Sequence, residues 1–432
     1  MGMMTALLLA LAAQDARDAL LRATDYFQKQ AKHGGYVWFH SADGLQRFGE
    51  GRAAPGQIWV QPPGTPAVGL AFLRAYEATK APRLLDAARD AGRALLHGQL
   101  KSGGWTYSID FDPKSKPPRN YTTFDDDTTQ CALRFLAELD RVLEFKDAPI
   151  HQAVEVAVDA LLKAQFPNGA FPQGFDRPSV PHPVKPAAFP AGDWRELPRV
   201  KEYWSLYTLN DGLAGKMVDT LLVLHRVYGR KDVLGSLEKL GDFLLLARCP
   251  EPQPAWAQQY DVDMRPAWAR KFEPPAVTGW ESQDVCEALM AVHEATKNPK
   301  YLEPVAPAIA YLRKSLLPDG RLARFYELKT NRPLYLNRAY QVVYTDDDLP
   351  AHYGFTQAAR LDVLERELAR VKAGQPKMAA AVDVRRAIET LDAEGRWVEE
   401  DSGRRGVPAG RWVRSDTFVR NVEALSAQLR AK

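Results

Sequence analysis

The sequence predicts an all-α protein, an incomplete α/α toroid of helical hairpins with long aromatic and proline-rich loops and short β pieces. Apolar residues recur with helical spacing along most of the chain, and short connections join consecutive helices in pairs. A loop rich in glycine, proline and aromatic residues follows each pair. These loops begin near Gly34, Gly103, Asn168, Pro254 and Asp319. Their spacing of roughly 65 to 86 residues is enough for two helices and a loop, as in an α/α toroid.

Helical periodicity predicts the individual helices in order. They cover residues 14–32, 65–79, 82–98, 126–144, 150–165, 211–228, 231–247, 281–297 and 300–316. In the helix at 126–144, Ala132, Phe135 and Leu139 fall on one apolar stripe. Gly229 follows the helix at 211–228, where a C-terminal glycine cap is expected. Because only Gly229 and Arg230 separate this helix from the next, the two should form a hairpin.

The chain is expected to divide into a toroid over residues 14–350 and a C-terminal extension over 351–432 that packs on it. The extension holds many arginines and ends in a helix near 417–430. A proline-rich stretch, Pro178–Pro198, lengthens the third interval and predicts a lid or rim insertion. The alternation in Trp105–Ile109 predicts a short strand.

The N-terminal residues 1–13 are apolar and end in small residues, which is typical of a secretory signal peptide, although no positive residue precedes them. A secreted or periplasmic protein is therefore expected. No other stretch is long and apolar enough to predict a membrane span. Cys131, Cys249 and Cys286 are far apart and odd in number, so buried free thiols are expected rather than a disulfide framework.

Bulk composition argues against several classes of protein. The chain has 432 residues, of which 46% are apolar, enough for a large core. A net charge of +3 is too small to indicate nucleic-acid binding. The sequence contains neither a P-loop nor a paired Cys-x-x-Cys motif. The 10 tryptophans include several in loops, where they can stack on sugar rings or pack between helices.

Three helix starts carry acids at matching positions of the repeat. They read Thr123-Phe-Asp-Asp126, Thr208-Leu-Asn-Asp211 and Thr278-Gly-Trp-Glu281. Because stacked repeats bring equivalent helix ends to one face, these acids should gather in one site. A single acid at such a position is explained by helix capping. The run Asp125-Asp126-Asp127 exceeds that need, and without histidine or cysteine it favours calcium or magnesium.

Two loops on the same face combine cations with aromatic residues. One runs from Arg265 to Pro275 and includes Arg270 and Lys271, and the other runs from Arg324 to Arg338. Arginine binds carboxylates through two parallel hydrogen bonds, and lysine binds them as a point charge. Salt bridges to neighbouring glutamates are the simpler explanation for any single arginine. Acids for a cation, cations for an anion and aromatic walls together suggest an acidic sugar polymer as the ligand.

The chain resembles the polysaccharide lyase family 10 pectate lyases over roughly residues 15–345. The resemblance rests on the TFDD helix start, on TLNDGLAGKM, and on the longer stretches AWAQQYDVDMRPAWARKFEPPAVTGWES and LARFYELKTNRPLY. It implies a partial α/α toroid that cleaves polygalacturonate or pectin with calcium (Ca²⁺). The partner is then an acidic polysaccharide, with no nucleic acid or membrane involved.

The resemblance also implies residue roles. Asp125, Asp126 and Asp211 match calcium-site positions. Arg270 matches the proposed catalytic base. The matches to cations that grip uronate carboxylates are Lys271, Arg324, Arg332 and Arg338. The family usually has asparagine at the position of Asp126, so this chain has one more negative charge at the expected cation site. The proline-rich insertion and the C-terminal extension are further departures.

Other functions remain open on the residues alone. A glycoside hydrolase on an α/α toroid could use paired carboxylates, with Asp125 or Asp126 opposite Asp211 or Glu281. A catalytically silent protein that binds acidic polysaccharide would need the same residues for recognition. A terpenoid-cyclase-like toroid could use the run Asp125–Asp127, but the further acid it needs is replaced by Thr129.

Overall fold

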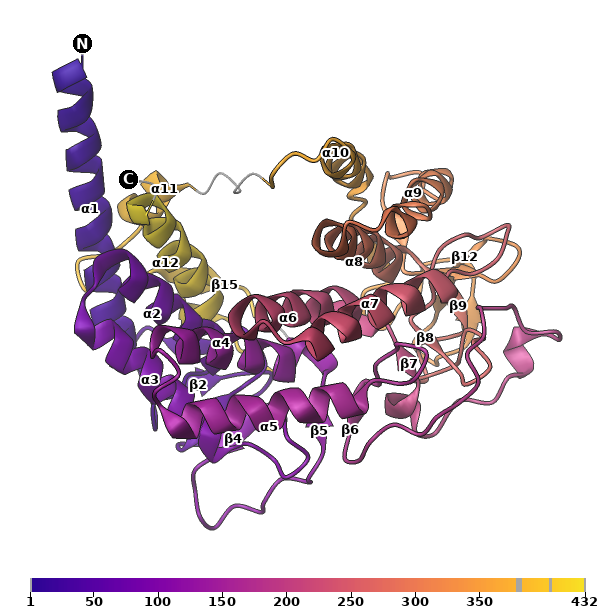
Figure 1. Ribbon diagram of the computed structural model, residues 1–432, viewed down its shortest axis with the longest axis horizontal. Helices are drawn as coiled ribbons and strands as arrows, with labels where there is room; N and C mark the ends of the chain where they lie inside the picture. The colour runs from indigo at the N-terminus through magenta and orange to yellow at the C-terminus, as the bar shows by residue number, and fades with distance from the viewer. Residues whose placement is uncertain (1, 378–382, 404–405, 431–432) are drawn as a thin grey trace. The chain divides into compact units, whose positions relative to one another are not determined.

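The computed structural model describes residues 2–377, 383–403 and 406–430, with side chains from residue 14 onward (Figure 1). Helices dominate, and the connecting loops contain short strands, so the all-α prediction is confirmed. The predicted signal segment, residues 1–13, lies outside the residues whose side chains are described. No helix in the described part of the chain combines the length and apolarity needed to span a bilayer.

Most predicted helices are present within a few residues of their expected bounds. The helices are α1 (Gly2–Gln28), α2 (Thr65–Thr79), α3 (Pro82–His97), α4 (Thr128–Val142), α5 (Ala148–Ala164), α6 (Leu213–Tyr228), α7 (Lys231–Leu246), α8 (Gly279–Thr296), α9 (Val305–Lys314), α10 (Leu361–Lys372), α11 (Val384–Glu389) and α12 (Ser415–Arg430). The prediction of one helix over 300–316 was wrong. A 3₁₀ turn at Pro299–Leu302 precedes α9, because Pro304 has no N–H to continue a helix and its ring clashes with the preceding turn.

The strands are short and lie in the loops. They are β1 (Phe39–Ser41), β2 (Arg47–Phe48), β3 (Gln57–Trp59), β4 (Ser108–Asp110), β5 (Thr122–Thr123), β6 (Gly174–Phe175), β7 (Tyr207–Thr208), β8 (Gln259–Tyr260), β9 (Ala276–Thr278), β10 (Leu322–Ala323), β11 (Phe325–Glu327), β12 (Pro333–Leu336), β13 (Val342–Val343), β14 (Thr356–Gln357), β15 (Val398–Asp401) and β16 (Gly410–Arg414). The strand expected at Trp105–Ile109 is shifted to β4, which pairs with β3 through Ile58 and Ile109.

The chain forms two compact units that do not follow the predicted boundary at residue 350. Unit 1 contains Met1–Thr122, Asp127–Val158 and Ala379–Lys432, and unit 2 contains Thr123–Asp126 and Asp159–Met378. Much of the segment predicted as a C-terminal extension therefore belongs to unit 1, while α10 belongs to unit 2. A lyase-like domain over 14–350 stays a prediction.

Unit 1 joins the beginning and the end of the chain. Strand β16 pairs with β1, where Phe39 lies opposite Arg414. Helix α12 packs against α1 and α2. Its Phe418 stacks on Phe27 with ring centroids 3.9 Å apart, and both rings are buried.

Unit 2 contains the helical hairpin α6/α7, with α8 packed against it and α9 and α10 packed against α8. The hairpin turns at Gly229, which has a φ of 63° and donates its N–H to the carbonyl of His225, as the predicted glycine cap requires. A sheet of order β13-β12-β11-β9 lies in the loops of the same unit. The predicted free, buried thiols of Cys131, Cys249 and Cys286 are confirmed.

Candidate active site

Two matching turns present acids immediately before α4 and α6. Each is a 3₁₀ turn whose central residue is left-handed, with φ of 49° at Asp126 and 52° at Asp211. Residues other than glycine rarely adopt this conformation, although aspartate and asparagine tolerate it because their short side chains can bond locally. The residue after each acid, Asp127 or Gly212, is also left-handed. The similar sequences TFDDD and TLNDG thus form the same turn twice.

These turns bring together the three acids predicted to hold a metal. One oxygen from each of Asp125, Asp126 and Asp211 lies within 4.8 Å of the others. Calcium binds oxygen at about 2.3–2.6 Å, so two of its ligand atoms are at most about 5 Å apart. The acidic oxygens therefore have the spacing and chemistry that a calcium ion requires.

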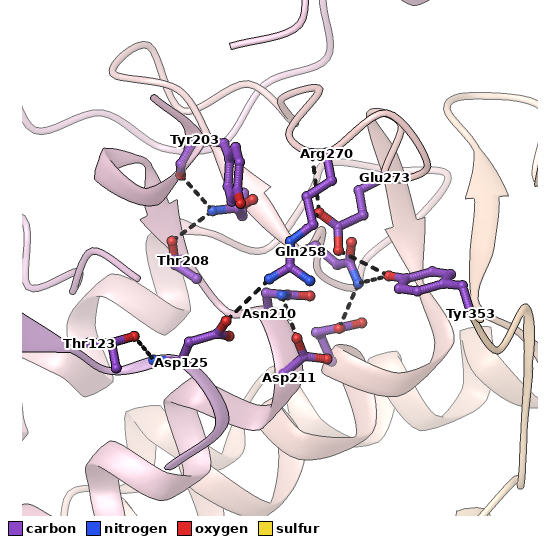
Figure 2. A network of polar contacts seen from close by, with 12 residues as sticks. Thr123, Asp125, Tyr203, Thr208, Asn210, Asp211, Gln258, Arg270, Glu273 and Tyr353 are labelled. Carbon is purple, nitrogen blue, oxygen red and sulfur yellow. Dashed lines mark hydrogen bonds and ion pairs between the residues drawn. The ribbon is translucent and has the colours of Figure 1, made fainter. Parts of the chain in front are cut away.

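Asn210 brings a further oxygen to the second turn. Its Nδ2 donates to Oδ2 of Asp211 at 2.6 Å (Figure 2). Its Oδ1 is buried and accepts no hydrogen bond from the described residues. Because a buried amide oxygen is normally satisfied, this atom is consistent with a ligand that the protein itself does not supply.

Glu281, the third acid of the predicted pattern, has a different environment. It lies in the first turn of α8 and is buried, with Gln258 Nε2 donating to its Oε1 at 3.0 Å. Burial raises the pKa of Glu281, and the nearby Arg324 guanidinium opposes that effect. Residues 279–281 continue directly from β9 into the helix, without a left-handed turn, so Glu281 does not join the acidic cluster.

Two arginines approach the acidic cluster. Arg270 Nη2 donates to Oδ2 of Asp125 at 3.3 Å (Figure 2). Arg324 Nη2 donates to Oδ1 of Asp211 at 3.1 Å and lies 3.6 Å from Oε1 of Glu281. Since Arg270 and Arg324 come from the two predicted basic loops, the structure brings both loops to the acids.

Arg270 and Glu273 form a partly buried pair. The Arg270 backbone N–H donates to Oε2 of Glu273 at 3.2 Å, and its side-chain Nε lies 3.6 Å from the same oxygen. Burial raises the pKa of Glu273 to about 7, against the opposing effect of Arg270. Burial alone would lower the pKa of Arg270, but the carboxylates of Glu273 and Asp125 outweigh it and raise that pKa. Arg270 is therefore charged in this structure.

Tyr353 and Gln258 belong to the site but were missed by sequence reasoning. The Tyr353 hydroxyl donates to Oε1 of Glu273 at 3.1 Å and accepts from Gln258 Nε2 at 3.3 Å (Figure 2). Gln258 and Glu273 both lie within the long motif that carries the family resemblance, which was the available signal. Tyr353 had none, because it lies in the segment assigned to the C-terminal extension.

Tyr203 and the proline-rich insertion flank Arg270. The Arg270 guanidinium carbon lies 5.6 Å from the centroid of the Tyr203 ring. The insertion lies beside the loop that carries Arg270, since the N–H of Ala188 donates to the carbonyl of Met264. Just beyond the insertion, the N–H of Val200 donates to the carbonyl of Trp268. The segment predicted as a lid or rim therefore braces the loop of the predicted base.

The remaining predicted cations lie in three different settings. Lys271 is exposed, with its Nζ 3.7 Å from the centroid of the Tyr340 ring. Arg332 is exposed over Tyr344, also at 3.7 Å. Arg338 pairs with Asp348 at 3.1 Å on an exposed loop instead of contacting the acids.

Residues 113–323 match the model of the pectic acid lyase family. Over this stretch the chain is pectate lyase-like. The match includes both acidic turns, Arg270 and Glu281, and confirms the resemblance seen in the sequence. No curated protein matches the chain in sequence.

The fold of this pectate lyase-like protein is similar to that of a family 10 polysaccharide lyase from Cellvibrio cellulosa. A mutant of that lyase, in complex with trigalaturonic acid, matches with a TM-score of 0.51 and 18% identity over 72% of this chain and 99% of the other. A second structure of the lyase matches with a TM-score of 0.50 and 19% identity over 69% and 95% of the two chains. These likenesses support the toroid-type fold and, with the family match, a polysaccharide lyase.

Proposed function

We propose that this protein is a pectate lyase that cleaves polygalacturonate by calcium-assisted β-elimination. The observation that carries the proposal is the meeting of three carboxylates within 4.8 Å of one another, with Arg270 and Arg324 bound to two of them. That the Cellvibrio cellulosa lyase binds trigalaturonic acid supports an acidic polysaccharide as the substrate.

Calcium would be held by Asp125, Asp126 and Asp211, with the buried Oδ1 of Asn210 as a further candidate ligand. Oxygen donors with three negative charges suit a hard divalent cation. When bound, calcium withdraws charge from the substrate carboxylate and so makes the neighbouring C5 proton more acidic. The helix N-termini that follow both turns repel a cation, which is why several carboxylates are needed.

The protein's own cations act on the substrate carboxylates. Removal of the C5 proton of a 4-linked uronate leaves negative charge next to its carboxylate, and the O4 leaving group then departs. A fixed guanidinium stabilises that developing charge without rearranging during the reaction. Arg324 is held by Asp211 and Glu281 and is suited to this role. Lys271 and Arg332 are proposed to bind further uronate carboxylates.

Arg270 is the proposed base, following the family resemblance of the sequence. Its carboxylate partners Asp125 and Glu273 favour the charged guanidinium, so it must lose a proton before it can accept one. A cation held by Asp125 would compete for the carboxylate that now stabilises this charge. The model therefore requires an alkaline activity profile, since arginine otherwise has a pKa above about 12.

The test is incubation of the purified protein with polygalacturonate, with calcium and with EDTA. A lyase releases a product with a C4–C5 double bond that absorbs ultraviolet light, and EDTA abolishes its formation. No unsaturated product under any condition would refute the proposal. Secretion or export to the periplasm follows as part of the proposal, because the polymer is extracellular.

The same assay separates the alternatives. A glycoside hydrolase using Asp125 or Asp126 with Asp211 or Glu281 would give products with saturated non-reducing ends and would not need calcium. A silent binding protein would be retarded by polygalacturonate in affinity electrophoresis and would release no product.

Substitution of Arg270 tests its role as base. Arg270→Ala should abolish turnover while binding of polygalacturonate remains measurable, because the other cations are intact. Arg265→Ala is the matched control: Arg265 lies in the same loop but pairs with Asp261 and Asp263, and its loss should leave turnover near wild type. Near-wild-type product release by Arg270→Ala would exclude Arg270 as base.

A further inference from the structure

Three tyrosines from one short segment lie under three of the predicted uronate-binding cations. Tyr340 lies under Lys271, Tyr344 under Arg332 and Tyr353 under Arg324, and the distances from Nζ or Cζ to the ring centroids are 3.7, 3.7 and 4.3 Å. The cations come from separate loops and strands, whereas the rings come from one stretch after β12. Residues 340–353 form this stretch, the tyrosine segment. It lies outside the part of the chain matched by the pectic acid lyase model.

A ring holds a cation differently from a carboxylate. The face of an aromatic ring attracts an ammonium or guanidinium through its quadrupole and adds no opposite charge. Stacking also leaves the N–H edge of a guanidinium open to a carboxylate. A side-chain carboxylate would instead occupy the donors and cancel the charge that a substrate carboxylate needs.

Lys271 and Arg332 are exposed, and among the described residues neither belongs to an ion pair. Glu327, whose charge Arg332 influences, accepts hydrogen bonds from Arg195 and Tyr344 instead. Cations elsewhere in the same loops are neutralised: Arg338 pairs with Asp348. The cations over Tyr340 and Tyr344 thus contact aromatic rings, and no carboxylate is in salt-bridge contact with either among the described residues.

The tyrosine segment is anchored to buried acids. The Tyr344 hydroxyl donates to Oε1 of Glu327 at 2.5 Å, and the Tyr353 hydroxyl donates to Oε1 of Glu273 at 3.1 Å. Both glutamates are buried. Phe272 lies between the rings, 4.6 Å from Tyr353 and 6.1 Å from Tyr340. Hydrogen bonds thus hold Tyr344 and Tyr353, while ring contacts hold Tyr340.

We propose that Tyr340 and Tyr344 are positioning residues that orient Lys271 and Arg332 for the carboxylates of the substrate. The inference rests on the proposed function, since it takes a uronate chain as the ligand. The tyrosines act through the cations and do not touch the reacting atoms. Their loss should weaken substrate binding without slowing the chemical step.

A double-mutant cycle tests the proposal. Isothermal calorimetry with a galacturonate trimer should show that Tyr340→Leu weakens binding roughly three-fold, as expected for an exposed cation–π contact. Tyr340→Phe keeps the ring and should bind as wild type. In a Lys271→Gln background, Tyr340→Leu should have no further effect, because the ring acts through the lysine. Tyr344→Leu with Arg332→Gln forms the second cycle.

Steady-state kinetics adds a readout that a merely structural role would not give: KM should rise in Tyr340→Leu while kcat stays unchanged. Tyr76→Leu is the control, since Tyr76 lies under Lys80 on α2 at 5.5 Å and belongs to unit 1. The inference would be overturned if Tyr340→Leu lowered the trimer affinity equally in the wild-type and Lys271→Gln backgrounds, or in neither. It would also be overturned if the wild-type protein bound no trimer. Trimer binding with the expected cycle but no unsaturated product would instead refute the lyase and leave the inference standing.

Discussion

Asp126 concentrates negative charge at a backbone position that few side chains tolerate. Its φ of 49° is left-handed, and it shares the acidic cluster with Asp125 and Asp211. Asparagine adopts this conformation as readily as aspartate, so the turn does not explain the acid. Under the proposed function, the additional charge would strengthen the binding of calcium.

Asp126→Asn should therefore weaken calcium binding roughly ten-fold, because calcium affinity depends on the charge of the ligand set. Calorimetric titration of the purified protein with calcium measures this without any substrate. Asp127→Asn is a close control: Asp127 is also left-handed, but it pairs with Arg134 and lies outside the cluster. Equal calcium affinity in the two variants would contradict the assignment of Asp126.

Glu273 should give the activity a pH dependence near neutrality. Its pKa is raised by burial from 4.5 to about 7, so the carboxylate that pairs with Arg270 forms only as the pH rises through about 7. The pH profile of kcat/KM should therefore include a rising limb near pH 7, and Glu273→Gln should lose this limb while keeping any more alkaline rise. In Glu327→Gln the limb should remain, because neighbouring donors lower the pKa of Glu327. A limb that persists in Glu273→Gln would assign it to another group.

At the scale of single elements, the start of α6 is held by an acid from α8. The N–H of Gly215 donates to Oδ2 of Asp284 at 3.1 Å. A carboxyl oxygen at a helix N-terminus accepts a hydrogen bond from a free backbone donor, and it can do so when the group is neutral. Asp211 lies in the turn immediately before α6. By holding the start of α6, Asp284 therefore helps to position Asp211 in the acidic cluster.

The contribution of Asp284 to the stability of the fold should decrease as the pH rises. Burial raises the pKa of Asp284 from 3.8 to about 7, so its contribution to folding is most favourable below about pH 4 and is lost as the pH rises through about 7. Asp284→Asn removes this dependence and should gain about 1–3 kcal/mol relative to wild type between pH 5 and pH 8. Urea unfolding at the two pH values measures the difference.

Asp232→Asn provides a control of opposite sign. Arg230 lowers the pKa of Asp232 in the first turn of α7, so its charged form stabilises the fold above its ordinary pKa. The Asn variant should lose stability relative to wild type at high pH instead of gaining it. A stability difference for Asp284→Asn that stays constant with pH would show that its carboxyl is not shifted.

At the scale of the whole molecule, the sequence predicted what is local and repeated. Helix bounds followed from periodicity, and the repeat of TFDD and TLND predicted that Asp125 and Asp211 would meet. Partners that depend on tertiary packing were not predictable. Arg270 and Asp125 are 145 positions apart; the repeat placed their loops on one face, but it did not predict that these two side chains would pair. Tyr353 carries no local pattern and belonged to a segment without a predicted role.

The place of the C-terminal segment in the fold was likewise not predictable from local sequence, because its membership in unit 1 depends on contacts with the start of the chain. Phe418 is 1% exposed and packs against Phe27 and Phe72 at 3.9 and 5.5 Å between ring centroids. Phe418→Ala should therefore destabilise unit 1 by about 3–5 kcal/mol, through lost burial and the cavity left behind. Urea unfolding of the full chain measures this.

Phe145→Ala is the control, because Phe145 is 44% exposed in the same unit and should change stability little. If the C-terminal segment were an appended cap that unfolds separately, Phe418→Ala would leave the unfolding transition of the rest of unit 1 unchanged. If the segment shares the core of unit 1, the whole unfolding transition of unit 1 should shift.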